Sequence, residues 1–283
     1  MTLTKKHNPN RPSNYPYLSG DTFRDFADHV WDEDTKNFKP EAVLQREIVF
    51  VPTHKIFEFF QTYHSDIKNP YILITHNSDH EVDHEKACLI DEKIIHWFGQ
   101  NVTSEHPKLT PLPIGLENAH HNKNGVISNF EEVVSNSSIP DKDRILYGFR
   151  WQNNPTKRIP AYIRLKLLST ATPITTWPEP KEYLEMLAEY KFVASPPGNG
   201  VDCIRTWESM YLGVIPIVKK TLLTDYFIKI GLPMWAVASW SELGSYSEAD
   251  LCEKYTQIMN SCSRETLYAD YWFNLISTIE KDI

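Results

Sequence analysis

The chain contains little cysteine and glycine, no long apolar run and no concentrated positive charge. Its longest nearly apolar run, Tyr211–Val218, falls far short of the roughly 20 residues that a membrane-spanning helix requires. The first residues, Met1–Asn14, are polar and lack the apolar core of a secretory signal. Neither a membrane-spanning protein nor a secreted precursor is therefore expected.

Cysteine and basic residues are both too sparse to support several common functions. The 4 cysteines include no C-x-x-C pair, which indicates structural thiols in a reducing compartment and hence a cytoplasmic protein. Lys and Arg number 29 against 37 Asp and Glu, for a net charge of −8. Without a basic cluster, nucleic acid is not expected as a partner.

Short apolar runs, each followed by polar residues, dominate the first half of the 283-residue chain. Runs of this length between helical patterns are typical of buried parallel strands. The four predicted strands are Arg46–Pro52, Tyr71–Thr75, Ile94–Gly99 and Leu109–Ile114. Before them, apolar spacing predicts a helix over Asp21–Trp31, with Gly20-Asp21 as a turn and N-cap at its start. The polar stretch Asn118–Asp143 interrupts the pattern and predicts a domain junction.

A second series of alternating strands and helices follows this junction. The predicted strands are Arg144–Phe149, Thr172–Thr176, Tyr190–Ser195, Val214–Val218 and Met234–Val237, and the predicted helices are Arg158–Leu168, Pro180–Glu189, Asp202–Leu212, Leu222–Ile230, Ser247–Cys262 and Arg264–Ile279. Two such series predict an α/β protein with two Rossmann-like domains facing across a cleft. We expect domains over residues 1–140 and 141–263, with residues 264–283 packing back across both.

The segment Phe192–Val218 is the most informative part of the sequence. In a chain with only 10 glycines, Gly198 and Gly200 lie two residues apart in a loop between a strand and a helix. Such a loop lets backbone amides approach a ligand, and the following helix N-terminus favours phosphate. Arg205 could meet a diphosphate, and Glu208 could accept hydrogen bonds from ribose hydroxyls. The glycine spacing fits neither a dinucleotide fingerprint nor a P-loop, and the chain has no G-x-S-x-G elbow.

This segment resembles the donor-binding stretch of exostosin-like glycosyltransferases, which combines F-x-x-x-P-x-G, a later arginine and G-x-I-P-V/I. The matching residues are Phe192, Pro196, Gly198, Arg205, Gly213, Ile215, Pro216 and Ile217, with Leu232, Pro233, Trp240 and Leu243 following. The resemblance implies the two-domain GT-B fold and transfer of a sugar from a nucleotide-sugar to a glycan or glycoconjugate, with inversion, in a step of polysaccharide biosynthesis. Gly200 stands where retaining GT-B enzymes carry the first of two glutamates.

We expect the donor site in the second domain, with no metal or other cofactor, because arginines can stabilise a leaving diphosphate. The expected donor-binding residues are Gly148, Arg150, Arg158, Ser195, Pro196, Gly198, Asn199, Gly200, Asp202, Arg205 and Glu208.

Transfer with inversion also needs a base for the acceptor hydroxyl, expected in the first domain. The candidates, in order, are Asp79, His76 and Asp21. Polar residues at strand ends are the expected acceptor-binding residues, namely Asn77, Asn101, Glu117 and Asn118. The acceptor could be linked to a lipid, so peripheral contact with a membrane surface stays open.

Two other functions remain possible from the sequence. His76, His80 and His84 are spaced by four, so on one helix they could hold zinc for a hydrolase. The protein could also be a catalytically inactive relative of such transferases. It would keep the Gly198 loop and bind nucleotide or glycan without turnover. Asp32-Glu33-Asp34 and Asp141-Lys142-Asp143 resemble the D-x-D of metal-dependent transferases but are expected to be surface charge.

Overall fold

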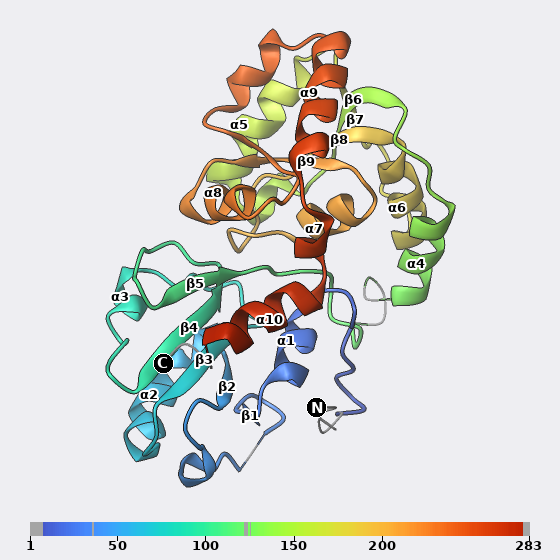
Figure 1. The fold of residues 1–283 in the computed structure, drawn as a ribbon. Helices are drawn as coiled ribbons and strands as arrows, with labels where there is room; N and C mark the ends of the chain where they lie inside the picture. Colours follow the sequence, from blue (N-terminus) through green and yellow to red (C-terminus); the bar gives the residue numbers. More distant parts are fainter. Residues whose placement is uncertain (1–7, 36, 122–123, 125, 280–283) are drawn as a thin grey trace. The chain divides into compact units, whose positions relative to one another are not determined.

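The computed structural model describes residues 8–35, 37–121, 124 and 126–279. The chain forms two compact units, unit 1 from residues 1–120 with 268–283 and unit 2 from residues 121–267 (Figure 1). Within the described ranges each unit is built around a five-stranded sheet in which all neighbouring strands are parallel. The expected α/β class, with two Rossmann-like domains, is confirmed.

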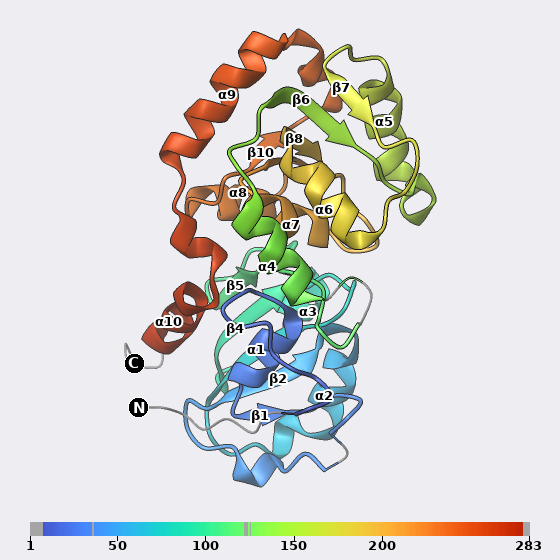
Figure 2. The same ribbon diagram turned by 90° about the vertical axis from the view of Figure 1, so that its right-hand side faces the viewer.

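The sheet of unit 1 keeps its strands in chain order. It contains β1 (His29–Val30), β2 (Ile48–Pro52), β3 (Tyr71–His76), β4 (Ile94–Gln100) and β5 (Leu109–Leu112), with helices α1 (Gly20–Phe26), α2 (Ile56–Thr62), α3 (His84–Ala87) and α10 (Ala269–Ile279). Each connection moves one strand further in the same direction, and such connections are right-handed. The connecting helices therefore cover only one face of the sheet. In Figures 1 and 2, α10 and α2 lie on opposite sides of this sheet.

Aromatic contacts hold α10 against α1, although the two helices lie far apart in the sequence. The rings of Phe26 and Phe273 stack with centroids 3.9 Å apart, and Phe23 meets Phe273 edge to face. Trp272 and Ile276 are fully buried on the same helix. Burial of side chains this large strongly favours packing over exposure of α10.

The sheet of unit 2 has a different order, β10-β9-β8-β6-β7. Its strands are β6 (Lys142–Tyr147), β7 (Ala171–Pro173), β8 (Tyr190–Ala194), β9 (Ile215–Lys219) and β10 (Trp235–Val237), and its helices are α4 (Ile127–Asn136), α5 (Pro155–Lys166), α6 (Pro180–Ala188), α7 (Ile204–Tyr211), α8 (Leu222–Lys229) and α9 (Glu248–Ser261). The chain leaves β6 in one direction and β8 in the other. Ligands of open α/β sheets bind in a crevice outside the carboxyl ends of two such adjacent strands.

Alternate residues of these strands build the core of unit 2. Ile145 and Tyr147 of β6, with Phe192 and Ala194 of β8, belong to one buried cluster that also includes residues of α5 and α9. The period of two places these side chains on one face of the sheet. The turn from α7 into β9 depends on Gly213, whose φ of 75° lies in the left-handed region.

Three local expectations were wrong or incomplete. The helix expected over Asp21–Trp31 ends at Phe26, and the next residues form β1, whose two residues are too few to show a strand period. Ser19, rather than Asp21, is the N-cap of α1, because its side chain accepts a hydrogen bond from the Thr22 amide. The polar stretch expected to be a junction contains α4, which buries Phe130 and Val133.

The division into units differs from the expected domain limits. The break falls between His120 and His121, so α4 belongs to unit 2. The last helix, expected to pack across both domains, contacts α1 in unit 1 through Phe273.

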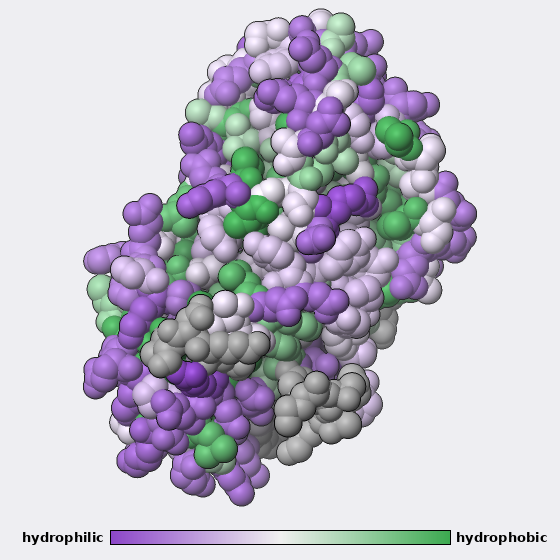
Figure 3. All heavy atoms as spheres, viewed as in Figure 1, coloured by the Kyte–Doolittle hydropathy of each residue, from purple (hydrophilic) through white to green (hydrophobic). Residues whose placement is uncertain are grey.

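The surface is mainly polar. In the view of Figure 3, hydrophobic residues form small separate groups among hydrophilic ones. None of the helices in the described ranges is both long and apolar enough to cross a membrane. All four cysteines are free thiols.

Candidate functional site

The loops after β6 and β8 meet at the carboxyl edge of the unit 2 sheet. Asn154 donates a hydrogen bond from Nδ2 to the Gly198 carbonyl at 2.7 Å. Its side-chain oxygen also caps α5, accepting from the Lys157 amide at 3.3 Å. One side chain thus fixes the glycine loop against the start of α5, at the point where the strand order reverses.

Arg158 is the central charged residue of this crevice. Its Nε donates to the Pro197 carbonyl at 3.0 Å and its Nη1 to the Arg150 carbonyl at 2.9 Å. The guanidinium also lies 5.9 Å from the centre of the Phe149 ring. Only 7% of the residue is exposed, and no carboxylate forms an ion pair with it in the described part of the chain.

An unpaired buried cation is costly, so this arrangement favours an anionic ligand. Burial is the largest cause that lowers the pKa of Arg158, and repulsion from Arg205 lowers it further. Gly198 adjoins this guanidinium closely, because a Cβ on residue 198 would lie 2.8 Å from Nη2. The glycine is needed here for close approach, since its φ is not in the left-handed region.

Arg205 approaches the same loop from α7. Its Nε donates to the Tyr183 hydroxyl of α6 at 3.2 Å, and the Glu208 carboxylate attracts its charge. Burial raises the pKa of Tyr183 to about 12. The phenol therefore stays neutral and holds the guanidinium as a hydrogen-bond acceptor. Two arginines from α5 and α7 thus face the glycine loop at a distance at which they repel each other electrostatically.

Two expected donor residues have mainly structural contacts. Asp202 is buried and accepts from the Trp207 indole at 2.8 Å and from the Cys203 amide at 2.8 Å. Ser195 is buried and its Oγ lies 2.8 Å from the Thr206 hydroxyl. These side chains join the loop to α7 rather than face solvent.

The other expected donor residues line the same loops. Pro196 and Gly200 are buried, while Asn199 is exposed at the tip of the loop. Arg150 is exposed, and only its backbone carbonyl contacts Arg158. Gly148 packs against Ile174, where a Cβ would come within 2.7 Å. The structure therefore brings together the loops that the sequence indicated, with Arg158, Gly198 and Arg205 at their centre.

In unit 1 a buried carboxylate organises a second polar cluster. Asp21 is fully buried and accepts from Arg11 Nη2 at 2.7 Å. Its other oxygen lies 2.7 Å from Nδ1 of His120, whose side chain is 25% exposed. A carboxylate can only accept from this nitrogen, so Nδ1 carries the proton and a neutral ring has its lone pair on Nε2.

Two asparagines connect this carboxylate to the end of β3. Asn77 donates to Asp21 Oδ1 at 3.2 Å and accepts from Asn118 Nδ2 at 3.0 Å. Asn118 in turn accepts from the Asp21 amide at 2.8 Å. Asn77 has a φ of 53°, a left-handed value that asparagine tolerates. Gly20 leaves the space for it, since a Cβ there would lie 1.7 Å from Asn77 Oδ1.

His76 lies beneath this cluster with both ring nitrogens engaged. Nε2 lies 2.9 Å from the Pro113 carbonyl, and Nδ1 accepts from the Asn77 amide at 2.7 Å. Burial lowers the pKa of His76 to about 4, so the ring is neutral at pH 7. With only 1% of the residue exposed, this geometry supports a positioning role rather than the expected role of a base.

The remaining residues expected in the first domain are placed differently. Asp79 is exposed in a bend after β3, outside the hydrogen-bonded cluster around Asp21. Asn101 is fully buried with a φ of 56°, and it donates to the Ser78 carbonyl at 3.2 Å. Its buried side chain serves the turn rather than a ligand. Glu117 is half-buried, and its carbonyl accepts from Asn14 at 2.9 Å.

The structure does not assemble the histidine stripe expected of a zinc hydrolase. His76 ends β3, His80 follows in a loop and His84 begins α3, so the helix that would align them does not exist. Across the described ranges no group of three or more His, Cys, Asp or Glu residues could hold a metal ion.

Acidic residues of Asp32–Asp34 and of Asp141–Asp143 form ion pairs, as is expected of surface charge. Asp32 pairs with Arg24 at 2.6 Å, although it is buried rather than exposed. Asp143 pairs with Lys191 and is half-buried. Neither triplet follows a buried strand in the way that the D-x-D motif does.

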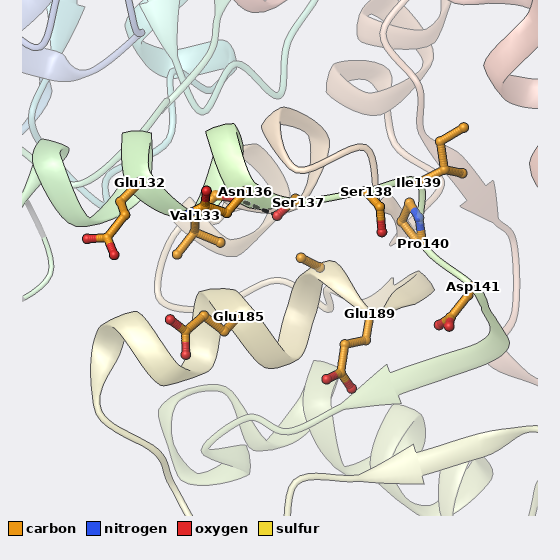
Figure 4. A pocket seen from close by; sticks show the side chains of 11 residues that line it. Glu132, Val133, Asn136, Ser137, Ser138, Ile139, Pro140, Asp141, Glu185 and Glu189 are labelled. Carbon is orange, nitrogen blue, oxygen red and sulfur yellow. Dashed lines mark hydrogen bonds between the residues drawn. The ribbon is translucent and has the colours of Figure 1, made fainter.

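A groove of about 270 Å³ between α4 and α6 carries several carboxylates (Figure 4). Glu132 pairs with Lys181 at 2.6 Å, and Glu189 pairs with Lys142. Figure 4 shows Glu132 and Glu185 on facing helices. Lysines pair with two of the four acidic residues that line the groove, and neither Arg158 nor Arg205 lines it, so it is not the candidate site.

Sequence reasoning missed four residues that complete the two sites, namely Arg11, His120, Asn154 and Tyr183. Asn154 precedes Pro155 at a helix start, a cap signal that was available. Arg11 and His120 lie outside helices and strands, where no periodicity marks them. Tyr183 has the spacing of an ordinary helix residue.

The chain matches no protein-family model and no curated protein sequence. Three solved structures are similar in outline. An apo structure of OtsA is 8% identical over 85% of this chain and 74% of that chain, with a TM-score of 0.48. The pneumococcal O-GlcNAc transferase GtfA, solved with UDP and GlcNAc, is 12% identical over 84% of this chain, with a TM-score of 0.38.

This chain spans 58% of the GtfA chain. The UDP-GlcNAc 2-epimerase of Methanocaldococcus jannaschii is 10% identical over 82% of this chain and 76% of its own, with a TM-score of 0.35. None of these similarities by itself assigns a reaction or a ligand to this chain.

Proposed function

We propose that this protein is a glycosyltransferase that binds a nucleotide-sugar in the crevice of unit 2. The observation that carries the proposal is the buried guanidinium of Arg158 at the strand-order reversal, which contacts two backbone carbonyls, the Phe149 ring and the Cys203 thiol and forms no ion pair with a carboxylate in the described part of the chain. A diphosphate supplies the negative charge that Arg158 lacks, and it would also attract the neighbouring Arg205. A guanidinium group can donate two parallel hydrogen bonds to the oxygens of a diphosphate. It also stabilises the negative charge that develops on the diphosphate as it leaves.

Different residues of the site would bind different groups of the donor. Arg158 and Arg205 would bind the diphosphate, and Glu208, one turn along α7, would accept hydrogen bonds from the ribose hydroxyls. The N-cap residue of α7, Cys203, makes no capping bond through its side chain among the described residues. The N-terminus of this helix is therefore a further favourable position for phosphate.

We further propose the inverting reaction that the resemblance to exostosin-like enzymes implies. The acceptor oxygen bonds to the anomeric carbon as the bond from that carbon to the phosphate oxygen breaks. The electron pair of the broken bond leaves with the nucleoside diphosphate. The hydroxyl proton passes to a base, for which we propose His120, which lies 2.7 Å from the Asp21 carboxylate that orients it. Asp79 remains the alternative base.

Donor binding is tested by thermal shift with UDP-, GDP- and CMP-sugars. We expect one of them to raise the melting temperature, because a ligand that binds only the folded state stabilises it. Arg205→Ala should weaken that nucleotide-sugar by at least about tenfold, as a charge-assisted bond is lost. Arg164→Ala is the control, since it removes an arginine of α5 that contacts the Ser241 carbonyl instead of the glycine loop. A folded protein that none of these compounds stabilises would overturn the proposal.

The base is tested separately once a donor and an acceptor are known. His120→Gln should lower turnover by about a hundredfold or more while donor affinity stays within twofold. Asp79→Asn is the comparison for the alternative. If both variants turn over normally, neither residue is the base. If donor binds but no transfer or hydrolysis occurs in the unmodified protein, the chain is a binding relative rather than an enzyme.

A further inference from the structure

Helix α5 presents an unusual apolar stripe to solvent. Ile159 and Ile163 of α5 and its C-cap residue Leu167 follow one another at four-residue intervals and are 37%, 55% and 71% exposed. This spacing places them on one face of the helix. The opposite face holds Arg158, Ala161 and Leu165, which are buried against the unit 2 core. In Figure 2, α5 lies at the outer edge of unit 2.

Two exposed aromatic residues belong to α5 and to the short helix that precedes it. Tyr162 is partly exposed on α5, and Trp151 is partly exposed in the short helix Trp151–Asn153 that precedes it. Tyrosine and tryptophan favour the boundary between apolar and aqueous surroundings, because one end of each ring is polar. We call this surface, made of Trp151, Ile159, Tyr162, Ile163 and Leu167, the α5 face.

The charge around the α5 face has the opposite sign to that of the whole protein. The helix contains Lys157, Arg158, Arg164 and Lys166 and no acidic residue, in a chain with a net charge of −8. Lys157 and Lys166 are exposed. The segment Trp240–Ser245, which packs against α5, adds Glu242, whose carboxylate accepts from the Ser239 amide at 2.6 Å.

A groove of about 680 Å³ continues the α5 face toward the end of β9. Its apolar lining includes Pro160, Pro197 and Trp240, and its basic lining includes Lys219 and Arg164. Cations beside apolar surface suit a molecule with an anionic head and an apolar tail. A polar protein partner would gain nothing from the exposed leucine and isoleucines.

We propose that the α5 face docks on an anionic lipid surface. Ile159, Ile163 and Leu167 would enter the boundary between headgroups and acyl chains, with α5 lying parallel to the surface. Lys157 and Lys166 would meet anionic headgroups, and Trp151 and Tyr162 would lie at headgroup level. The docking concerns the outer face of α5, so it stands or falls independently of whether Arg158, on the inner face, binds a nucleotide-sugar.

The test is co-sedimentation of the full chain with vesicles of phosphatidylcholine alone and of phosphatidylcholine mixed with phosphatidylglycerol. We expect binding to the mixed vesicles, weakened by salt. The double variant Ile163→Ser/Leu167→Ser should lower the partition coefficient by at least about tenfold, because two exposed apolar side chains no longer enter the lipid. Lys157→Gln/Lys166→Gln should reduce binding to the mixed vesicles by about tenfold.

Matched controls keep the result interpretable. Leu44→Ser and Ile139→Ser remove exposed apolar side chains of similar size elsewhere, from residues that are 60% and 79% exposed, and should bind like the unmodified protein. All variants change surface residues, so circular dichroism should show unchanged folding. Equal sedimentation of every variant, or no sedimentation of the unmodified protein, would overturn the proposal. Self-association that Ile163→Ser/Leu167→Ser abolishes would also overturn it, by identifying a second copy as the occupant.

Discussion

The guanidinium of Arg158 and the backbone of Gly198 are so close that a Cβ on residue 198 would lie 2.8 Å from Nη2. Arg158 in turn holds the Pro197 carbonyl at 3.0 Å. The positions of the glycine loop and of Arg158 therefore depend on each other. Any side chain on residue 198 must displace either the charge or the loop.

Gly198→Ala should consequently weaken the nucleotide-sugar that stabilises the protein by about tenfold or more, since the displaced guanidinium loses a charge-assisted bond. Calorimetric titration measures this change. Gly244→Ala is a close control, because a Cβ at residue 244 would lie 2.4 Å from Nη2 of Arg164, another arginine of α5. Equal loss of affinity in both variants would show that general disturbance of α5, rather than the position of Arg158, governs binding.

Asp202→Ala should lower stability without a comparable loss of ligand affinity. The buried Trp207 indole would lose its acceptor, 2.8 Å away, at a cost of about 1–3 kcal/mol in the free energy of unfolding. Chemical denaturation measures the first effect and nucleotide-sugar titration the second. A large loss of affinity with unchanged stability would instead support the donor-binding role that the sequence predicted.

Gly20→Ala should destabilise unit 1. A Cβ on residue 20 would lie 1.7 Å from Asn77 Oδ1, so the Asp21–Asn77–Asn118 network cannot persist unchanged. Overpacking at such a site costs about 1–3 kcal/mol in the free energy of unfolding. Gly99→Ala, where the nearest atom would be 3.1 Å away, should cost less. The two variants can be compared by urea denaturation, and an equal cost would contradict the reasoning.

Stability should decrease as the pH falls from about 6.5 toward 4. Burial lowers the pKa of His76 to about 4 from its ordinary 6.5, and that of His96, also mainly by burial, to about 4. In this interval the unfolded chain binds protons that the folded chain excludes, so protonation favours unfolding. His76 alone contributes roughly 3 kcal/mol of stability above pH 6.5 that is lost near pH 4.

Melting temperatures at pH 7 and pH 5 test this dependence. His76→Gln should melt lower than the unmodified protein at pH 7 but show a smaller decrease between the two values. His96→Gln should also show a smaller decrease in melting temperature between pH 7 and pH 5 than the unmodified protein. An unchanged decrease in both variants would mean that other groups control the acid sensitivity.

The strands were predictable where their apolar runs are continuous. β2 and β3 are buried along their whole length, so every residue carries the signal of a strand covered on both faces. β1 contains only His29 and Val30 and continues the apolar spacing of the helix before it. Its pairing with β2 is a tertiary effect that no local pattern contains.

The candidate sites were predictable to the extent that strand ends determine them. His76, Asn77 and Asn118 follow apolar runs, and parallel strands bring such ends to one edge of a sheet. Arg158 donates to two backbone carbonyls, and Arg205 donates to a tyrosine of α6. Such contacts depend on the path of loops in space, which composition and periodicity do not encode.

The stacking of Phe26 on Phe273 joins residues from nearly opposite ends of the chain. Unit 2 is a contiguous segment of residues 121–267, whereas unit 1 also needs residues 268–283. As the chain emerges from a ribosome, unit 2 can therefore complete its sheet before unit 1 receives α10. Until then Phe23 and Phe26 lack their partner Phe273, so the segment of unit 1 that is synthesised before unit 2 finishes folding after it.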